Sequence, residues 1–210
     1  DIEGAYRSEH ELIKRYREMA LHPECDGAIE DVVNEAIVSD LYDSPVEVEL
    51  SNLNASDTIK KKIREEFRYL KELMDFDKKS HEIFRNWYID GRLFYLKVID
   101  TKNPQEGIKD LRYIDPMKLK YVRVEKKTNG VNNNLNNIRI NQKDDSIPNP
   151  QFDEYYIYTM KPNYPTGMIA QAGKGSTKIS KDSITYCTSG LVDRNKNRVL
   201  SYLHKAIKAL

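Results

Sequence analysis

Apolar residues recur every three or four positions through the first part of the chain, which is the spacing of one face of a helix. Two such stretches cover residues 9–20 and 23–37, and a third begins after Ser56. Ser8 and Glu11 form a capping box, because the serine hydroxyl can accept from a first-turn N–H while the glutamate reaches back. The first two predicted helices cannot bury their apolar faces alone, so they need a partner surface.

The third predicted helix has an apolar side and a basic start. Its apolar side consists of Ile59, Ile63, Phe67, Leu70 and Met74. Near its start lie Lys60, Lys61, Lys62 and Arg64. Positive charge at a helix N-terminus opposes the macrodipole, so these bases indicate a role other than helix stability. Before this helix, residues 46–50 alternate apolar and acidic side chains, which predicts a half-exposed strand.

The stretch from Ile83 to Val124 organises the rest of the predicted fold. After a short break at residues 75–80, helical spacing continues as far as Gly91. Glycine tolerates the left-handed geometry that ends many helices, so we expect the helix to stop there. Residues 93–99 then have the period of a strand that is buried on at least one face.

A second corner of the same type follows the next predicted strand. Residues 101–107 contain Asn, Pro and Gly and predict a turn, and residues 111–114 predict a strand. Asp115 and Pro116 end that strand, because proline lacks the ladder N–H and biases its predecessor toward extended geometry. A third apolar run continues from there to Val124.

The remaining residues predict short strands and one more helix. Residues 126–150 contain eight asparagines and predict a flexible loop or hairpin tip. Strands are predicted at 154–160 and within 178–187, with a turn-rich connection at 161–177. Residues 199–210 have helical spacing. Helices, then a mainly antiparallel sheet, then a final helix make an α+β fold.

Charge is distributed unevenly along the chain. Residues 1–50 hold fourteen acidic and four basic residues, a net charge of −10, and the other 160 residues carry +11. Such asymmetry indicates interaction surfaces, or an acidic face packed near a basic one within the chain. The two cysteines, Cys25 and Cys187, lie far apart without a disulfide or zinc pattern. No apolar run approaches the roughly 20 residues that cross a bilayer.

The most tempting catalytic motif departs from its template. Residues 167–176 resemble a phosphate-binding P-loop, but five residues rather than four separate Gly167 from Gly173, and Gly175 replaces the Ser or Thr after Lys174. A flexible loop is the favoured interpretation. The four histidines lack metal-ligand spacing, and no paired carboxylates or nucleophile motif occurs. We therefore expect no catalytic, metal or cofactor site.

The end of the chain carries the clearest electrostatic feature. Five bases gather there: Arg194, Lys196, Arg198, Lys205 and Lys208. Such a stripe could attract duplex DNA without sequence preference. It could equally meet the acidic residues 1–50 of a neighbouring copy in a closed ring, and we favour that interface over DNA contact.

Several collinear blocks resemble a known family. They are Tyr88-Ile-Asp-Gly-Arg-Leu-Phe94, Leu111-Arg-Tyr-Ile-Asp-Pro116 and flanking segments at residues 16–36 and 189–208. Together they resemble the wing region of tailed-bacteriophage portal proteins, the head-to-tail connectors of T-even-type myoviruses. The resemblance marks Asp90, Gly91, Asp115 and Pro116 as structural corners with a role in backbone geometry.

The resemblance implies a division of the chain. Residues 1–125 would be the helical part and first strands of the wing, whereas the Asn-rich loop at 126–150 departs most from the family pattern, so the resemblance implies nothing for it. Residues 151–190 would supply the remaining wing strands, and 191–210 the start of a helix leading toward the stem. The chain would then be part of a longer protein, and this part would supply wing-region subunit and capsid contacts.

The resemblance also implies a function and partners. Portal subunits form a dodecameric ring at one capsid vertex, through which double-stranded DNA is packaged and ejected. The ring nucleates head assembly, joins head to tail, and contacts the major capsid protein, the terminase large subunit and neck proteins. The implied location is the virion, after assembly inside the host cell, with the inner face of its membrane as one option. No enzymatic activity and no cofactor are implied.

Two alternatives stay open from the residues alone. One is a monomeric nucleic-acid-binding accessory domain, which the mass of the full-length protein would exclude if it forms a ring. The other is a degenerate nucleotide-binding enzyme, which would lose ATP binding on Lys174→Ala. Neither alternative uses the Asp90 and Asp115 corners.

Overall fold

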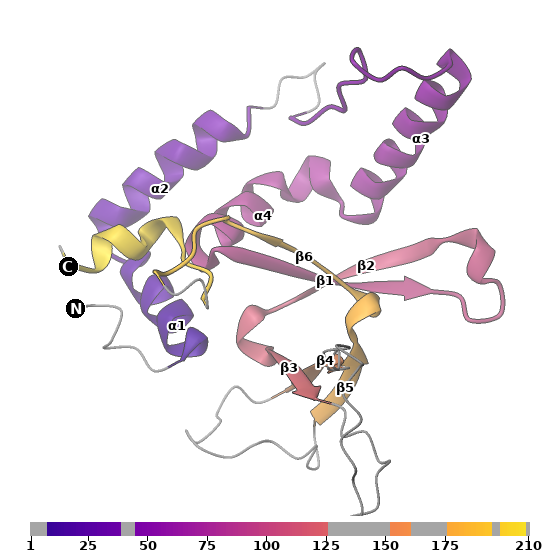
Figure 1. Cartoon of the computed structure of the whole chain (residues 1–210). Coiled ribbons are helices and arrows are strands. Elements are labelled where there is room, and N and C mark those ends of the chain that lie inside the picture. Colours follow the sequence, from indigo (N-terminus) through magenta and orange to yellow (C-terminus); the bar gives the residue numbers. More distant parts are fainter. Residues whose placement is uncertain (1–7, 39–44, 126–151, 161–175, 195–197, 209–210) are drawn as a thin grey trace, which may run out of the picture. The chain divides into compact units, whose positions relative to one another are not determined.

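The computed structural model describes residues 8–38, 45–125, 152–160, 176–194 and 198–208 (Figure 1). The chain forms two compact units, each described here by itself. The first unit comprises Asp1–Lys118 and Asp182–Leu210, and the second comprises Leu119–Lys181. The units do not follow chain order as the division expected from the sequence does, because residues after 181 return to the first unit.

Four α-helices form in the first unit. They are α1 Glu9–Met19, α2 Pro23–Ala36, α3 Asp57–Leu73 and α4 Phe76–Asp90. The predicted capping box is confirmed, since Ser8 Oγ accepts from the Glu11 N–H and the Glu11 carboxylate accepts from the Ser8 N–H, both at 3.2 Å. The break predicted at 75–80 is too long, because α4 already begins at Phe76. Only Met74 and Asp75 separate α3 from α4, and Asp75 is left-handed with φ 49°.

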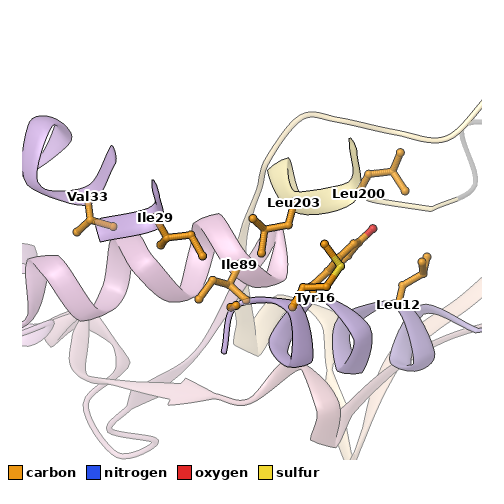
Figure 2. Close-up of a cluster of buried hydrophobic side chains, with 9 residues drawn as sticks. Leu12, Tyr16, Ile29, Val33, Ile89, Leu200 and Leu203 are labelled. Atoms are coloured by element: carbon orange, nitrogen blue, oxygen red, sulfur yellow. The ribbon is translucent and has the colours of Figure 1, made fainter. Parts of the chain in front are cut away.

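The core of this unit lies between α1, α2, α4 and the C-terminal segment. Tyr16 on α1 is completely buried at its centre, and its hydroxyl lies 2.8 Å from His204 Nδ1. Figure 2 shows side chains from all four elements converging there. The buried residues are Leu12, Tyr16, Met19, Ala20, Ile29, Val33, Ile89, Leu200 and Leu203. The apolar faces of α1 and α2 therefore have the partner surface that their sequences require.

The sheet of the first unit has β1 in its centre. Its strands are β1 Arg92–Ile99, β2 Ile108–Ile114 and β6 Ile184–Thr188, in the order β2-β1-β6 with both pairings antiparallel. Phe94 pairs with Ile114 on one side and with Tyr186 on the other. The turn between β1 and β2 contains the 3₁₀ helix η1 Pro104–Glu106. The predicted strands and turn are confirmed, with β2 starting three residues earlier than expected.

The second unit contains a separate three-stranded antiparallel sheet. Its strands are β3 Leu119–Glu125, β4 Phe152–Thr159 and β5 Ser176–Ser180, in the order β3-β4-β5. Tyr121 and Tyr156 pair across β3 and β4 with ring centroids 5.4 Å apart. The Arg123 guanidinium lies 3.8 Å from the centroid of the Phe152 ring. The expected loop at 126–150 and most of the expected connection at 161–177 lie outside the described residues.

Two predictions near these sheets are wrong. Residues 46–50 form no strand. Alternation of apolar and polar residues indicates a half-buried extended segment, but a strand also needs a hydrogen-bonded neighbour. The expected helix at 199–210 is a 3₁₀ helix, η4 Tyr202–Lys208. Val199 instead bridges to Val192, and Ser201 Oγ accepts from the Leu203 N–H at 3.0 Å at the start of η4. The α+β class is confirmed.

Two further 3₁₀ turns complete the element order. They are η2 Pro116–Lys118, which follows β2, and η3 Lys181–Ser183, which precedes β6. Among the residues that the structure describes, no helix combines the length and apolar character needed to span a bilayer.

Gly91 is the turning point between α4 and β1. Its φ is +71°, as the sequence predicts for a helix-ending glycine, and its N–H donates to the Trp87 carbonyl at 2.8 Å. The C-terminal segment passes so close that a Cβ at this position would lie 2.6 Å from the Leu200 carbonyl oxygen. Ser189 closes the junction, since its N–H donates to the Gly91 carbonyl at 2.8 Å.

We predict that Gly91→Ala destabilises the protein by about 2 kcal/mol or more, since backbone strain and a steric clash coincide. Gly190→Ala is the matched control, because Gly190 also has positive φ (77°) but no atom within 4 Å of an added Cβ. Urea unfolding of both variants measures the difference. Equal losses would show that the approach of Leu200 contributes nothing.

Candidate functional site

Arg17 joins the two acidic corners that stand out in the sequence. Its guanidinium contacts Asp90 through Nε–Oδ1 at 2.9 Å and Nη2–Oδ2 at 2.7 Å. The same group contacts Asp115 through Nη2–Oδ1 at 2.8 Å and Nη1–Oδ2 at 3.5 Å. One planar cation thus binds both oxygens of two carboxylates. We call Arg17, Asp90 and Asp115 the corner clamp.

Each member of the corner clamp is placed by a local signal. Arg17 lies in the last turn of α1, where a cation complements the macrodipole. Asp90 is the last residue of α4, held by the stop at Gly91. Asp115 follows β2, and its Oδ1 also accepts from the Met117 N–H at 3.0 Å, which orients the carboxylate at the start of η2.

Burial determines the electrostatics of the corner clamp. The Asp90 side chain is only 3% exposed, whereas Arg17 and Asp115 are 38% and 30% exposed. Burial raises the pKa of Asp90, and the two hydrogen bonds from Arg17 oppose that shift. Hydrogen bonds to Asp90 raise the pKa of Arg17 far above its already high value. The cation is therefore permanent and compensates a carboxylate that water cannot reach.

The pKa of Asp115 is shifted in the direction opposite to that of Asp90. Burial acts to raise its pKa, but hydrogen bonds from Arg17 and from the Met117 N–H outweigh it, so the pKa lies below its ordinary value. The hydroxyl of Tyr113, beside the corner clamp, has a raised pKa because of burial and then the charges of Asp90 and Asp115. The raised pKa keeps the Tyr113 hydroxyl neutral at pH 7, and Arg17 pairs with both carboxylates beside it.

An open cleft of about 370 Å³ lies over the corner clamp. Its lining residues are Arg17, Ala20, Leu21, Arg85, Asn86, Ile89, Asp90, Tyr113 and Asp115. In the described part of the chain, no three His, Cys, Asp or Glu side chains are grouped as metal ligands. The cleft therefore presents the charged corner clamp beside the apolar side chains of Ala20, Leu21 and Ile89.

A second buried arginine secures the C-terminal segment beside the first corner. Arg92 is 5% exposed, its Nη1 lies 3.0 Å from Glu9 Oε2, and its Nη2 donates to the Val199 carbonyl at 2.6 Å. Ser201, completely buried, donates to the Tyr88 carbonyl at 2.9 Å. Both corners are therefore fixed by side chains from elsewhere in the sequence.

The structure describes three side chains of the five C-terminal bases. Arg194 and Lys205 are exposed and Arg198 is partly buried, with its N–H 3.2 Å from Asp193 Oδ1. Lys196 and the side chain of Lys208 lie outside the described residues. The P-loop-like segment also lies outside them, apart from its last residue in β5.

The negative charges along one side of helix α2 are paired with an arginine. Arg85 on α4 contacts Asp26 and, through Nε–Oε1 at 3.1 Å, Glu30. Three other acids on α2 are exposed: Glu24, Asp31 and Glu35. With Ala28 they recur at intervals of four, three and four residues, on the side opposite the buried Ile29 and Val33. We call these four residues the α2 outer stripe.

Comparison with known proteins identifies the family. Residues 9–210 match the family described as "Bacteriophage T4-like portal protein (Gp20)". The chain belongs to this T4-like portal family. It is 34% identical over 204 residues to the portal protein of Vibrio phage KVP40, covering 94% of the chain and 36% of that protein. It is 35% identical over 115 residues to the portal protein of Salmonella phage ViI, covering 54% of the chain and 20% of that protein.

The portal-family chain therefore spans about a third or less of the length of these relatives. Within it, the structure brings Asp90 and Asp115 together and assigns them a pairing role besides their corner geometry. Sequence reasoning missed Arg17. The available signal was indirect: Asp90 precedes the glycine stop inside a helix that must be buried, and a buried carboxylate requires a cation.

We predict that Arg17→Ala destabilises this portal-family chain by about 3 kcal/mol, because it leaves the Asp90 carboxylate buried and unpaired. Arg17→Lys should lose less, since an ammonium keeps the charge but cannot bind two carboxylates bidentately. Arg15→Ala is the matched control on the same helix, because among the described residues Arg15 forms its ion pair with the exposed carboxylate of Glu18, at 3.7 Å. Chemical denaturation of the three variants measures the order. Similar losses for Arg15→Ala and Arg17→Ala would contradict it.

We predict that the stability deficit of Asp115→Asn depends on pH. The lowered pKa of Asp115 means that its ionised form stabilises the fold at pH values above an ordinary carboxyl pKa of about 4. This stabilisation is lost as the pH falls through the lowered value. Unfolding at pH 7 and at about pH 3 should show a deficit that shrinks in acid. An unchanged deficit would show that Asp115 acts without its charge.

Proposed function

We propose that this chain is part of a portal subunit, which forms a dodecameric ring at one capsid vertex of a phage virion. Double-stranded DNA would pass through the ring during packaging and ejection, and the ring would nucleate head assembly and join head to tail. The chain would supply wing-region contacts to neighbouring subunits and to the major capsid protein. The terminase large subunit and neck proteins would bind other regions of the subunit.

The family match over residues 9–210 is the observation that carries this proposal. The described residues add a physical argument for a structural role. Their best-formed polar site, the corner clamp, holds charges that are already paired, and burial makes it a fixed point of the fold. Such a site stabilises a shape rather than a transition state.

Charge supports a contact between copies. The α2 outer stripe is acidic and exposed, and a ring of identical subunits joins two different faces of the chain in a heterologous contact that closes. The C-terminal bases are one candidate for the opposing face or for DNA, with Arg194 and Lys205 exposed for either role. The alternative function is a monomeric nucleic-acid-binding domain.

We predict that the full-length protein assembles into rings whose mass, by native mass spectrometry or mass photometry, is a fixed multiple of the subunit. Particle images should show a closed ring with a central channel. A protein that stays monomeric at high concentration and binds duplex DNA with strong salt dependence would support the accessory-domain alternative instead.

A further inference from the structure

Helix α3 has an apolar stripe that the described chain covers only in part: Ile63 and Phe67 are half-buried, whereas Ile59 and Leu70 are exposed. None of its seventeen residues is buried. Ile59 is 51% exposed and Leu70 39% exposed, and both belong to the apolar stripe expected from the sequence. We call Ile59, Ile63, Phe67 and Leu70 the α3 stripe. A helix of this length with an apolar face is stable when that face packs against a partner.

The basic residues beside the α3 stripe also lack an explanation within the fold. Lys60 and Lys62 flank the stripe on its two sides by helical geometry. Both lie in the first two turns, where positive charge opposes the macrodipole. An apolar stripe edged by lysines is complementary to a helix face that carries carboxylates around a small residue.

The α2 outer stripe has this composition. It exposes Glu24, Asp31 and Glu35 around Ala28, and two exposed apolar residues lie just beyond the ends of the helix, Leu21 (82%) and Val38 (67%). The α2 outer stripe carries negative charge, whereas the lysines beside the α3 stripe carry positive charge. Leu21 and Val38 add apolar surface near the α2 outer stripe. Helix-on-helix packing of this kind buries apolar surface in the centre and leaves charge pairs at the rim.

The two surfaces are attached to different parts of α4. α3 leads into α4 at Phe76, whereas α2 is tied to it at Arg85, about 14 Å further along the helix. Figure 1 shows α3 joining one end of α4 and α2 beside the other half of that helix. A heterologous ring contact requires two different surfaces on one chain, and the two stripes are such a pair.

We propose that the α3 stripe of one subunit packs against the α2 outer stripe of the next subunit in the ring. This inference rests on the ring assembly proposed above and names the surfaces that form the contact. The attraction is apolar at its centre, and the flanking charges set which faces meet and how strongly salt weakens the encounter.

Charge reversal in the full-length protein tests the contact. Lys60→Glu/Lys62→Glu should lower subunit affinity at least about tenfold, because like charges then face each other. Asp31→Lys/Glu35→Lys should do the same from the other side. Lys61→Glu/Arg68→Glu is the matched control, because these bases lie on the back of α3 and the charge change is identical. Acidic residues near the start of α3 interact favourably with the helix dipole, so the charge reversal should not unfold the helix. A loss of assembly would therefore not be caused by a loss of folding.

Mixing the two interface variants makes the test decisive. Each should fail to form rings alone, whereas an equimolar mixture should form rings in which the variants alternate, because every contact then joins opposite charges. Mass photometry reads the result, and circular dichroism confirms folding. If the wild type forms rings but Lys60→Glu/Lys62→Glu assembles normally, or if the mixture stays unassembled, the contact is wrong while the ring stands. If the wild type forms no ring, the proposed function itself fails.

Discussion

The bidentate pairing of Arg17 with Asp90 and Asp115 is the constraint on which the first unit depends. It joins residues 73 and 98 positions apart in the sequence and brings the end of α1, the end of α4 and the end of β2 to one point. Because Asp90 is buried, the pairing cannot be exchanged for water without a large free-energy cost. The end of α4 is thereby fixed, and Gly91 can turn directly into β1 beneath the C-terminal segment.

Most elements of this fold are specified by residues that lie close together in the sequence, which is why the sequence predicts them. A capping box, a proline in the first helical turn and a helix-ending glycine each act within a few residues. The partner of Asp90 lies far from it in the sequence, so no local pattern specifies it. Arg15 and Arg17 are equivalent as sequence, and only the packing of Tyr16 into the core turns Arg17 toward the corners. Residues 46–50 fail as a strand for the same reason, since a strand depends on a distant neighbour.

Burial separates the predicted helices into two kinds. The stripes of α1 and α2 meet in the core around Tyr16, as amphipathic helices in one unit should. α3 has an equally regular stripe and buries no residue, although Tyr69 anchors its far end through a 3.0 Å hydrogen bond to the Ile108 carbonyl. The part of the α3 stripe that stays exposed, Ile59 and Leu70, is the apolar surface that the proposed contact would bury.

Net charge read from the sequence overstates the field that α2 presents. Arg85 binds two of its acids from within the fold, so the outward charge is that of the α2 outer stripe alone. The same contact fixes α2 to α4, and α4 continues through the left-handed Asp75 into α3. The spacing of the two proposed surfaces is thus set by one helix whose far end is held by the corner clamp. A contact between rigid surfaces loses little conformational entropy on assembly. A fixed angle between the two surfaces also favours a ring of one size.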